Sequence, residues 1–120
     1  MAAKDERGRA GEERAVRHLT DLGYDILDRN WRDRQGEIDI VASTPAELVV
    51  VEVKTRRSDG FGHPFEAVDV RKKDRLWRVA CAWMSAHPGL VRGRRMRLDV
   101  IGITGDDVAT ARIEHIEDLR

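Results

Sequence analysis

A carboxylate and an amine lie two positions apart in a valine-rich segment, residues 48–54. Valine is typical of strands with little exposed surface, so the segment predicts a buried strand. Successive side chains of a strand point to opposite faces, which places Glu52 and Lys54 on one face with Val50. Burying either charged group is costly unless it is paired or bound to something. Glu52 and Lys54 are therefore candidate site residues.

A second carboxylate is expected to face Glu52. Residues 36–42 predict the preceding strand, and a tight hairpin would pair Ser43 with Leu48. In that register Asp39 lies opposite Glu52, with Cβ atoms about 5 Å apart. Two carboxylates at this distance repel one another unless a cation lies between them or one is protonated. The hairpin therefore favours a cation site.

A third carboxylate comes from the first predicted helix, which runs from about Arg9 to Leu22. Glu12 precedes Val16 and Leu19 at helical spacing, so it lies along the apolar stripe. The neighbouring Glu13 is turned away by about 100°. Glu12 is thus expected to face the sheet and to reach its edge.

Three carboxylates suit a hard cation, so we expect Mg²⁺ or Mn²⁺ bound by Glu12, Asp39 and Glu52. Such an ion can polarise a phosphate and lower the pKa of a bound water. Lys54 would orient or deprotonate that water, or stabilise charge developing on the phosphate. The predicted catalytic residues are Lys54, Glu52 and Asp39. The alternative is a surface network of ion pairs, because an isolated Glu-x-Lys is common.

The charge distribution points to a polyanionic partner. The net charge is zero, yet residues 71–97 hold nine Lys or Arg and one acid, Asp74, for a local charge of +8. Such segregation can form a phosphate-binding face. The alternative is a solvated helix followed by a basic loop. The candidate nucleic-acid-binding residues are Arg56, Arg57, Lys72, Lys73, Arg94 and Arg95.

The elements that position these residues form one domain. Residues 1–8 are expected to be a flexible N-terminus, and residues 9–120 a single domain. Glycines and a proline in residues 55–64 predict a loop, and Asp69 is a candidate N-cap for a helix ending near Ala86. The predicted order is α-β-β-β-α-β-β, with strands at 24–30, 36–42, 48–54, 96–103 and 111–116. This order indicates an α/β fold with a mixed β-sheet flanked by helices.

The composition of the chain argues against several classes of protein. Hydrophobic residues make up 41% and charged residues 37% of the 120 residues, as in a globular protein. The single cysteine, Cys81, excludes an internal disulfide and a cysteine-based zinc cluster. There is no apolar signal segment, and no apolar run approaches the ~20 residues of a membrane helix. We expect a cytoplasmic protein that does not contact a membrane.

Asp39 followed by Glu52-Val53-Lys54 resembles the signature of the PD-(D/E)XK nuclease superfamily, which has the restriction-endonuclease-like fold. The chain is more closely similar to the YraN-like family of small, largely uncharacterised bacterial proteins. The segments that carry this resemblance keep their order along the chain: residues 8–12, 30–32, 36–39, 51–56 and 61–62, Lys72, and residues 97–100. Ile38 stands where the superfamily has a nominal, often absent, proline.

The resemblance implies a restriction-endonuclease-like core, metal binding at Asp39 and Glu52, and a catalytic role for Lys54. Glu12 matches a helix acid of the similar archaeal Holliday-junction resolvases. The implied activity is metal-dependent phosphodiester hydrolysis on DNA rather than RNA, in an endonuclease-like manner and at structured sites. The alternative is a nucleic-acid-binding module of the same fold without efficient catalysis. Dimers are common among similar resolvases, so a homodimer is a further expectation. Fold alone does not establish activity.

Overall fold

The structure, a computed structural model, describes residues 5–58, 60 and 69–119. It confirms the predicted order of elements, with one short helix added after the second long helix. The elements are α1 (Glu6–Asp21), β1 (Asp25–Asp33), β2 (Gly36–Ser43), β3 (Glu47–Arg56), α2 (Val70–Ala86), α3 (Pro88–Val91), β4 (Arg95–Thr104) and β5 (Arg112–Ile116).

The five strands form one mixed sheet in the order β1-β2-β3-β4-β5. Neighbouring strands are antiparallel except β3 and β4, which are parallel and joined through α2. The predicted hairpin register is confirmed near the turn, where Ser43 pairs with Leu48 and Ile40 pairs with Val51. The fold class is therefore the predicted one.

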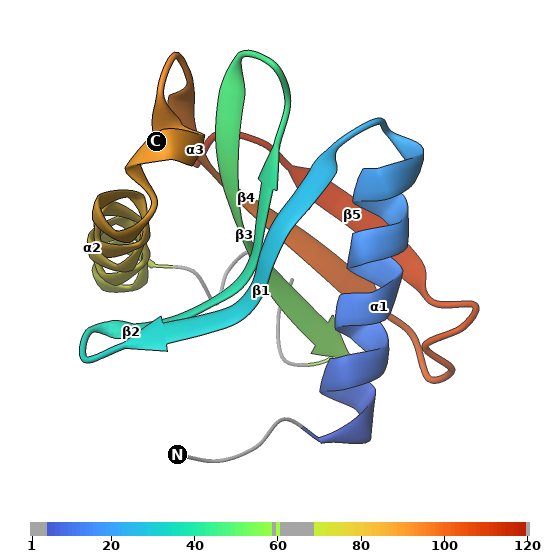
Figure 1. The fold of residues 1–120 in the computed structure, drawn as a ribbon. Helices are drawn as coiled ribbons and strands as arrows, with labels where there is room; N and C mark the ends of the chain where they lie inside the picture. Colours follow the sequence, from blue (N-terminus) through green and yellow to red (C-terminus); the bar gives the residue numbers. More distant parts are fainter. Residues whose placement is uncertain (1–4, 59, 61–68, 120) are drawn as a thin grey trace.

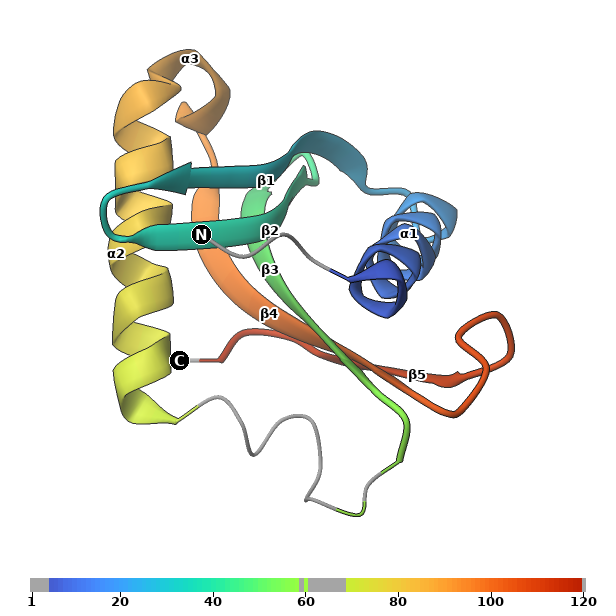
Figure 2. The same cartoon turned by 90° about the horizontal axis from the view of Figure 1, so that it is seen from below.

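The two long helices cover opposite faces of the sheet (Figures 1 and 2). Because side chains alternate between the two faces along β3, the core consists of one cluster on each face of the sheet. Val49 and Val51 pack in a cluster with Ala15 and Leu19 of α1. Leu48 and Val50 pack in a second cluster with residues of α2 that include Trp83. The sheet therefore separates an α1 face from an α2 face, and Glu52 and Lys54 continue the α2 face.

The N-terminal prediction was wrong in part, because α1 begins at Glu6 rather than near Arg9. Asp5 is the N-cap, and its Oδ1 accepts a hydrogen bond from the Gly8 backbone N–H at 2.7 Å. The Arg7 guanidinium donates to the backbone oxygens of Gly105 and Asp106 at 2.8 and 2.7 Å. These contacts hold residues 5–8, which were expected to be flexible.

The ends of two strands also differ from the predicted ones. β1 continues to Asp33, and β3 continues through Thr55 and Arg56, which were assigned to a loop. Half of that predicted loop, residues 59 and 61–64, lies outside the described residues. Pro88 begins α3, a position that proline favours in a helix. In the described part of the chain, no helix has the length and hydropathy needed to span a membrane.

Candidate functional site

The candidate site lies where β2 leaves β3. The β2–β3 pairing ends at Ile40 and Val51, while β2 stays paired with β1 as far as Gly36. The divergence is visible in Figure 2, where the β1–β2 hairpin extends to α2 and β3 runs away from it. Asp39 is the first residue past the last pair, and its Oδ2 accepts a hydrogen bond from the Val53 backbone N–H at 2.8 Å. The Asp39 side chain thus bridges the opening between the strands.

Asp39 and Glu52 form a hydrogen-bonded pair of carboxyl groups in this opening. Asp39 is 6% exposed, and the Glu52 side chain is 13% exposed. Burial, the hydrogen bond with Asp39 and the charge of Asp39 raise the pKa of Glu52 to about 8. At neutral pH and without a bound cation, the pair therefore holds a proton between its two carboxyl groups.

Two amines lie beside the pair. Lys54 Nζ is 3.7 Å from Glu52 Oε2. Lys72, from the first turns of α2, is hydrogen-bonded to Lys54, and this contact together with burial lowers the pKa of Lys72. A small cavity of about 130 Å³ opens here, lined by Glu52 and Lys72 together with Gly36, Glu37, Arg75, Leu76 and Val79. The structure thus brings Asp39, Glu52, Lys54 and Lys72 together.

Glu12 is buried as predicted, with 2% of its surface exposed, whereas Glu13 is exposed. It lines an open cavity of about 410 Å³ with Val53 and Thr55, on the α1 face. Glu52 faces α2, so Glu12 and Glu52 lie on opposite faces of β3.

The oxygen donors of Asp39 and Glu52 fit a hard divalent cation, because a cation would replace the proton that their mutual repulsion requires. Among the residues that the structure describes, no group of three or more His, Cys, Asp or Glu side chains is arranged to hold a metal ion. The described residues therefore offer a cation two carboxylate ligands, Asp39 and Glu52. A third ligand from Glu12 stays a prediction.

The predicted nucleic-acid-binding residues separate into two groups. Arg56, Arg57, Lys72 and Lys73 lie near the end of β3 and the start of α2. Arg57 is exposed and pairs with Asp106 at 3.3 Å. Lys73 lines an apolar groove with Trp77 and Leu98.

Arg94 and Arg95 lie at the other end of the sheet, where Arg95 pairs with Glu47 at the start of β3. Arg94 donates to the backbone oxygens of Thr44 and Leu90, at 3.0 and 2.8 Å. Arg95 forms an ion pair with Glu47 at 3.1 Å. Glu47 and Glu52 are five residues apart on the strand, which corresponds to about 17 Å. Arg94 and Arg95 therefore lie apart from the other four candidate residues.

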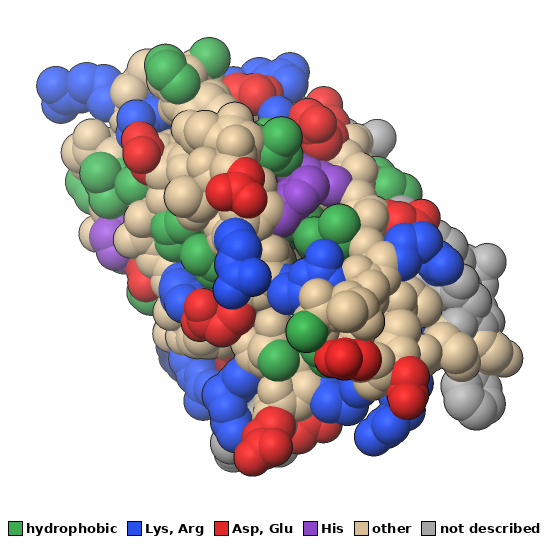
Figure 3. Space-filling model, turned by 90° about the vertical axis from the view of Figure 1, so that its right-hand side faces the viewer, with side chains coloured by type: hydrophobic (Ala, Val, Ile, Leu, Met, Phe, Trp, Pro, Cys, Tyr) green, Lys and Arg blue, Asp and Glu red, His purple; other side chains and the backbone are tan. Residues whose placement is uncertain are grey.

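The face that carries α1 and β5 also lacks a single basic patch. Figure 3 shows Lys and Arg side chains interspersed with Asp and Glu across it. Several basic residues form contacts that stabilise the fold, as Arg7 does with the backbone oxygens of Gly105 and Asp106.

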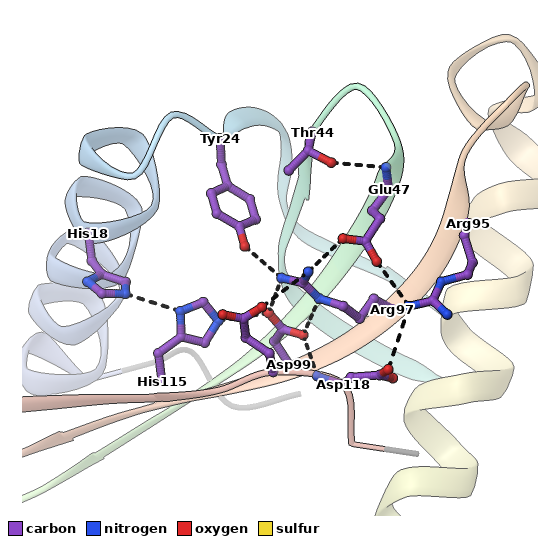
Figure 4. Close-up of polar contacts among 10 residues, drawn as sticks. His18, Tyr24, Thr44, Glu47, Arg95, Arg97, Asp99, His115 and Asp118 are labelled. Carbon is purple, nitrogen blue, oxygen red and sulfur yellow. Dashed lines mark hydrogen bonds and ion pairs between the residues drawn. The ribbon is translucent and has the colours of Figure 1, made fainter.

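A second polar cluster, on the α1 face, was missed in the sequence (Figure 4). Asp99 pairs with Arg97 through two hydrogen bonds of 2.9 and 2.8 Å. His115 contacts Asp99, and His18 contacts His115. His18 and His115 are 97 residues apart, so no local spacing could relate them.

Comparison with known proteins agrees with the sequence resemblance at the family level. A family model described as "Uncharacterised protein family UPF0102" matches residues 11–103. A UPF0102 protein of Kineococcus radiotolerans is 50% identical over 116 residues, which are 97% of this chain and 94% of the relative. A UPF0102 protein of Arthrobacter sp. (strain FB24) is 49% identical over 116 residues, 97% of each chain. This chain belongs to the uncharacterised protein family UPF0102.

Proposed function

We propose that this protein hydrolyses phosphodiester bonds in DNA with the help of Mg²⁺ or Mn²⁺ at the opening between β2 and β3. The observation that supports the proposal is the pair of hydrogen-bonded carboxyl groups of Asp39 and Glu52 with an amine 3.7 Å away. A fold stabilised only by packing gains nothing from two adjacent buried carboxyl groups. A divalent cation bound there would supply Lewis acidity at a phosphate oxygen.

The chain's own residues supply the rest of the chemistry. Asp39 and Glu52 would hold the cation, and the Val53 N–H fixes the Asp39 carboxylate through its 2.8 Å hydrogen bond. Lys54 lies where it can orient a water molecule or stabilise negative charge on the phosphate. Lys72, whose pKa is lowered by its hydrogen bond with Lys54, adds a second amine that can accept or donate a proton.

DNA would approach the strand opening from the end of β3. Arg56, Arg57, Lys72 and Lys73 are the basic residues nearest this end and would contact phosphates. Glu12 would contribute from the α1 face. Branched or flapped DNA is the expected substrate class, as the sequence resemblance implies. A cytoplasmic location and a homodimer stay predictions from the sequence.

The second candidate function is binding of nucleic acid without efficient cleavage. It is favoured by the absence, among the described residues, of an assembled group of three metal-ligand side chains. The two functions differ in one observable. Binding alone predicts salt-dependent DNA affinity that does not change when Mn²⁺ is added and gives no product.

The test is cleavage of linear, flapped and four-way DNA with Mn²⁺, for the natural protein and for Asp39→Asn, Glu52→Gln and Lys54→Met. We expect each substitution to lower the rate at least 100-fold, since it removes a ligand or the amine. Glu13→Gln is the matched control, because Glu13 is exposed on α1 next to Glu12. Its activity should equal that of the natural protein. Inactivity on every substrate, or activity that survives Glu52→Gln, would overturn the proposal.

A further inference from the structure

The second polar cluster joins α1, β3, β4 and β5 with Tyr24, the residue before β1, and its central side chains are buried (Figure 4). The Asp99 side chain has no exposed surface, and the His115 side chain is 9% exposed. Asp99 accepts hydrogen bonds from Arg97, from His115 and from the Asp118 backbone N–H. Arg97 also donates to the Tyr24 hydroxyl at 2.6 Å and to Glu47 at 2.7 Å. This cluster lies on the face of the sheet opposite Glu52 and is not part of the candidate site.

Asp99 determines which nitrogen of His115 carries a proton. Burial raises the pKa of Asp99, but hydrogen bonds from His115 and Arg97 outweigh it, so that the pKa is lowered and the carboxylate is ionised. The His115 Nε2–H donates to Asp99 Oδ2 at 2.7 Å. The other ring nitrogen, His115 Nδ1, is hydrogen-bonded to His18 Nε2 at 3.1 Å. A cation between the two nitrogens would replace the proton that they share.

Two imidazole nitrogens directed at each other are a recognisable pair of metal ligands. Zinc–imidazole bonds of about 2.0–2.1 Å place two such nitrogens about 3.3 Å apart on a tetrahedral ion. The observed 3.1 Å needs a small rotation of the more accessible His18 ring. A ligating histidine is usually held through its other nitrogen by a carboxylate, which is the position of Asp99.

A cavity beside His18 offers space for an ion. It has a volume of about 230 Å³ and is lined by Arg14, Arg17, His18, Asp21, Ala109 and Ile113. Figure 3 shows histidine atoms at the surface of this face. Arg14 donates through its Nη1 to the backbone oxygens of Val108 and Ala111, and Asp21 opposes its charge at His18. Burial and the neighbouring His115 lower the pKa of His18, which leaves its ring neutral at pH 7.

We propose that His18 and His115 bind a divalent transition-metal ion that prefers imidazole, with Zn²⁺ as the representative ion and Asp99 holding His115 in place. No third His, Cys, Asp or Glu completes such a group within the described ranges, so water from the cavity fills the other positions. The site is independent of the proposed nuclease function, because it uses nitrogen rather than oxygen ligands. It would tie α1 to β5 through the ion.

Calorimetric titration with Zn²⁺ at pH 7.5 in excess Mg²⁺ tests the proposal, because Mg²⁺ occupies oxygen sites. We expect one Zn²⁺ per chain and at least a 10-fold weaker affinity in both His18→Gln and His115→Gln. Asp99→Asn should weaken binding 10- to 100-fold. His87→Gln is the control, since His87 stacks on Trp83 at the end of α2. Glu52→Gln should bind Zn²⁺ like the natural protein.

A second measurement keeps the proposal testable if a histidine variant fails to fold. The natural protein with one equivalent of Cu²⁺ should show nitrogen hyperfine structure from two imidazoles in its electron paramagnetic resonance spectrum. Absence of Zn²⁺ binding would overturn the proposal. Affinity unchanged in both histidine variants, or a Cu²⁺ spectrum with oxygen ligands only, would also overturn it.

Discussion

At the scale of single residues, the candidate site depends on two carboxyl groups held closer than their charges allow. Asp39 is fixed by the Val53 N–H, and Glu52 lies against it in a partly buried opening. The protein without metal relieves the repulsion by keeping Glu52 protonated to about pH 8. This arrangement costs stability as pH rises, and that cost is measurable.

We predict that Glu52→Gln stabilises the metal-free protein at high pH. The pKa of Glu52 is raised from 4.5 to about 8 in the fold, so the unfolded chain releases its proton first as pH rises. Folding stability therefore falls between about pH 4.5 and pH 8. Gln mimics the protonated acid and avoids this loss, with a gain on the order of 2 kcal/mol at pH 9.

Urea unfolding in the presence of a chelator at pH 4 and pH 9 measures the gain. The variant should differ little from the natural protein at pH 4. Glu13→Gln serves as control, because the Glu13 side chain is 60% exposed and pairs with Arg29 on the surface. Equal stability of the Glu52 variant and the natural protein at pH 9 would contradict a shared proton.

At the scale of elements, α1 must approach β3 closely for Glu12 to reach the opening. Gly11 makes this approach possible, since a Cβ built there would lie 2.0 Å from Thr55 Oγ1. Any side chain at position 11 would therefore push α1 away from the strand. The residue before Glu12 sets the depth at which Glu12 is buried.

We predict that Gly11→Ala lowers stability by about 1–3 kcal/mol, because the overlap with Thr55 exceeds the helix-forming advantage of alanine. Thr55→Ala in the same chain should restore part of the loss, since it removes Oγ1, the nearest atom, and Cγ2. Gly89→Ala in α3 is the matched control, because nothing lies within 4 Å of its added Cβ. Chemical denaturation of the natural protein, these variants and the single variant Thr55→Ala measures this. Additive effects of Gly11→Ala and Thr55→Ala would contradict a direct contact.

The contact between α1 and β5 should weaken in acid. The pKa of His18 is lowered below 6.5 by burial and by His115, with Arg14 acting in the same direction and Asp21 opposing it. The neutral ring thus contributes stability well above pH 6.5, and this contribution is lost as pH falls below 6.5. Hydrogen exchange of α1 amides, with chelator present, should accelerate between pH 7 and pH 5 after correction for intrinsic rates. His18→Gln should abolish this change, and a persistent change would contradict the assignment.

The elements were predictable from the sequence where local patterns decide them. The valines of β3 and the pairing of Ser43 with Leu48 predicted the strand and its register. Asp69 caps α2 through a 2.9 Å hydrogen bond from the Lys72 N–H. Leu22, the expected end of the first helix, is its C-cap and is 58% exposed.

The candidate site was predictable only as far as alternation and register reach. These two patterns predicted that Asp39 faces Glu52 and that the Glu12 side chain faces the sheet. They could not show that β2 leaves β3 at Asp39, because strand divergence depends on packing of the hairpin against α2. The contact of Lys72 with Lys54 and the network of Asp99 join distant segments. Such contacts follow from tertiary packing, and no regular spacing of residues in the sequence indicates them.

At the scale of the whole molecule, the sheet keeps two polar centres apart. The carboxyl pair faces α2, and the Arg97–Asp99 cluster faces α1. The latter links β4 and β5 with Tyr24, just before β1, and with Glu47 at the start of β3. It therefore holds these segments together on the face of the sheet opposite the carboxyl pair.

We predict that Asp99→Asn lowers the melting temperature by more than about 10 °C. It removes a fully buried charge that Arg97 and His115 require, which typically costs about 3–5 kcal/mol. Arg112→Gln is the control, because Arg112 pairs with Glu114 at the surface of β5. Calorimetric melting at pH 7 measures both. A change of less than a few degrees in the Asp99 variant would show that the cluster does not stabilise the fold.

The central claim is that Asp39 and Glu52 together bind a divalent cation, and Mn²⁺ calorimetry at pH 7 in two buffers of different ionisation enthalpy tests it most directly. Because Glu52 is protonated in the metal-free protein, binding of Mn²⁺ should release about one proton per chain. Glu52→Gln should bind Mn²⁺ weakly and release none. Absence of Mn²⁺ binding, or binding and proton release that persist in Glu52→Gln, would contradict the account.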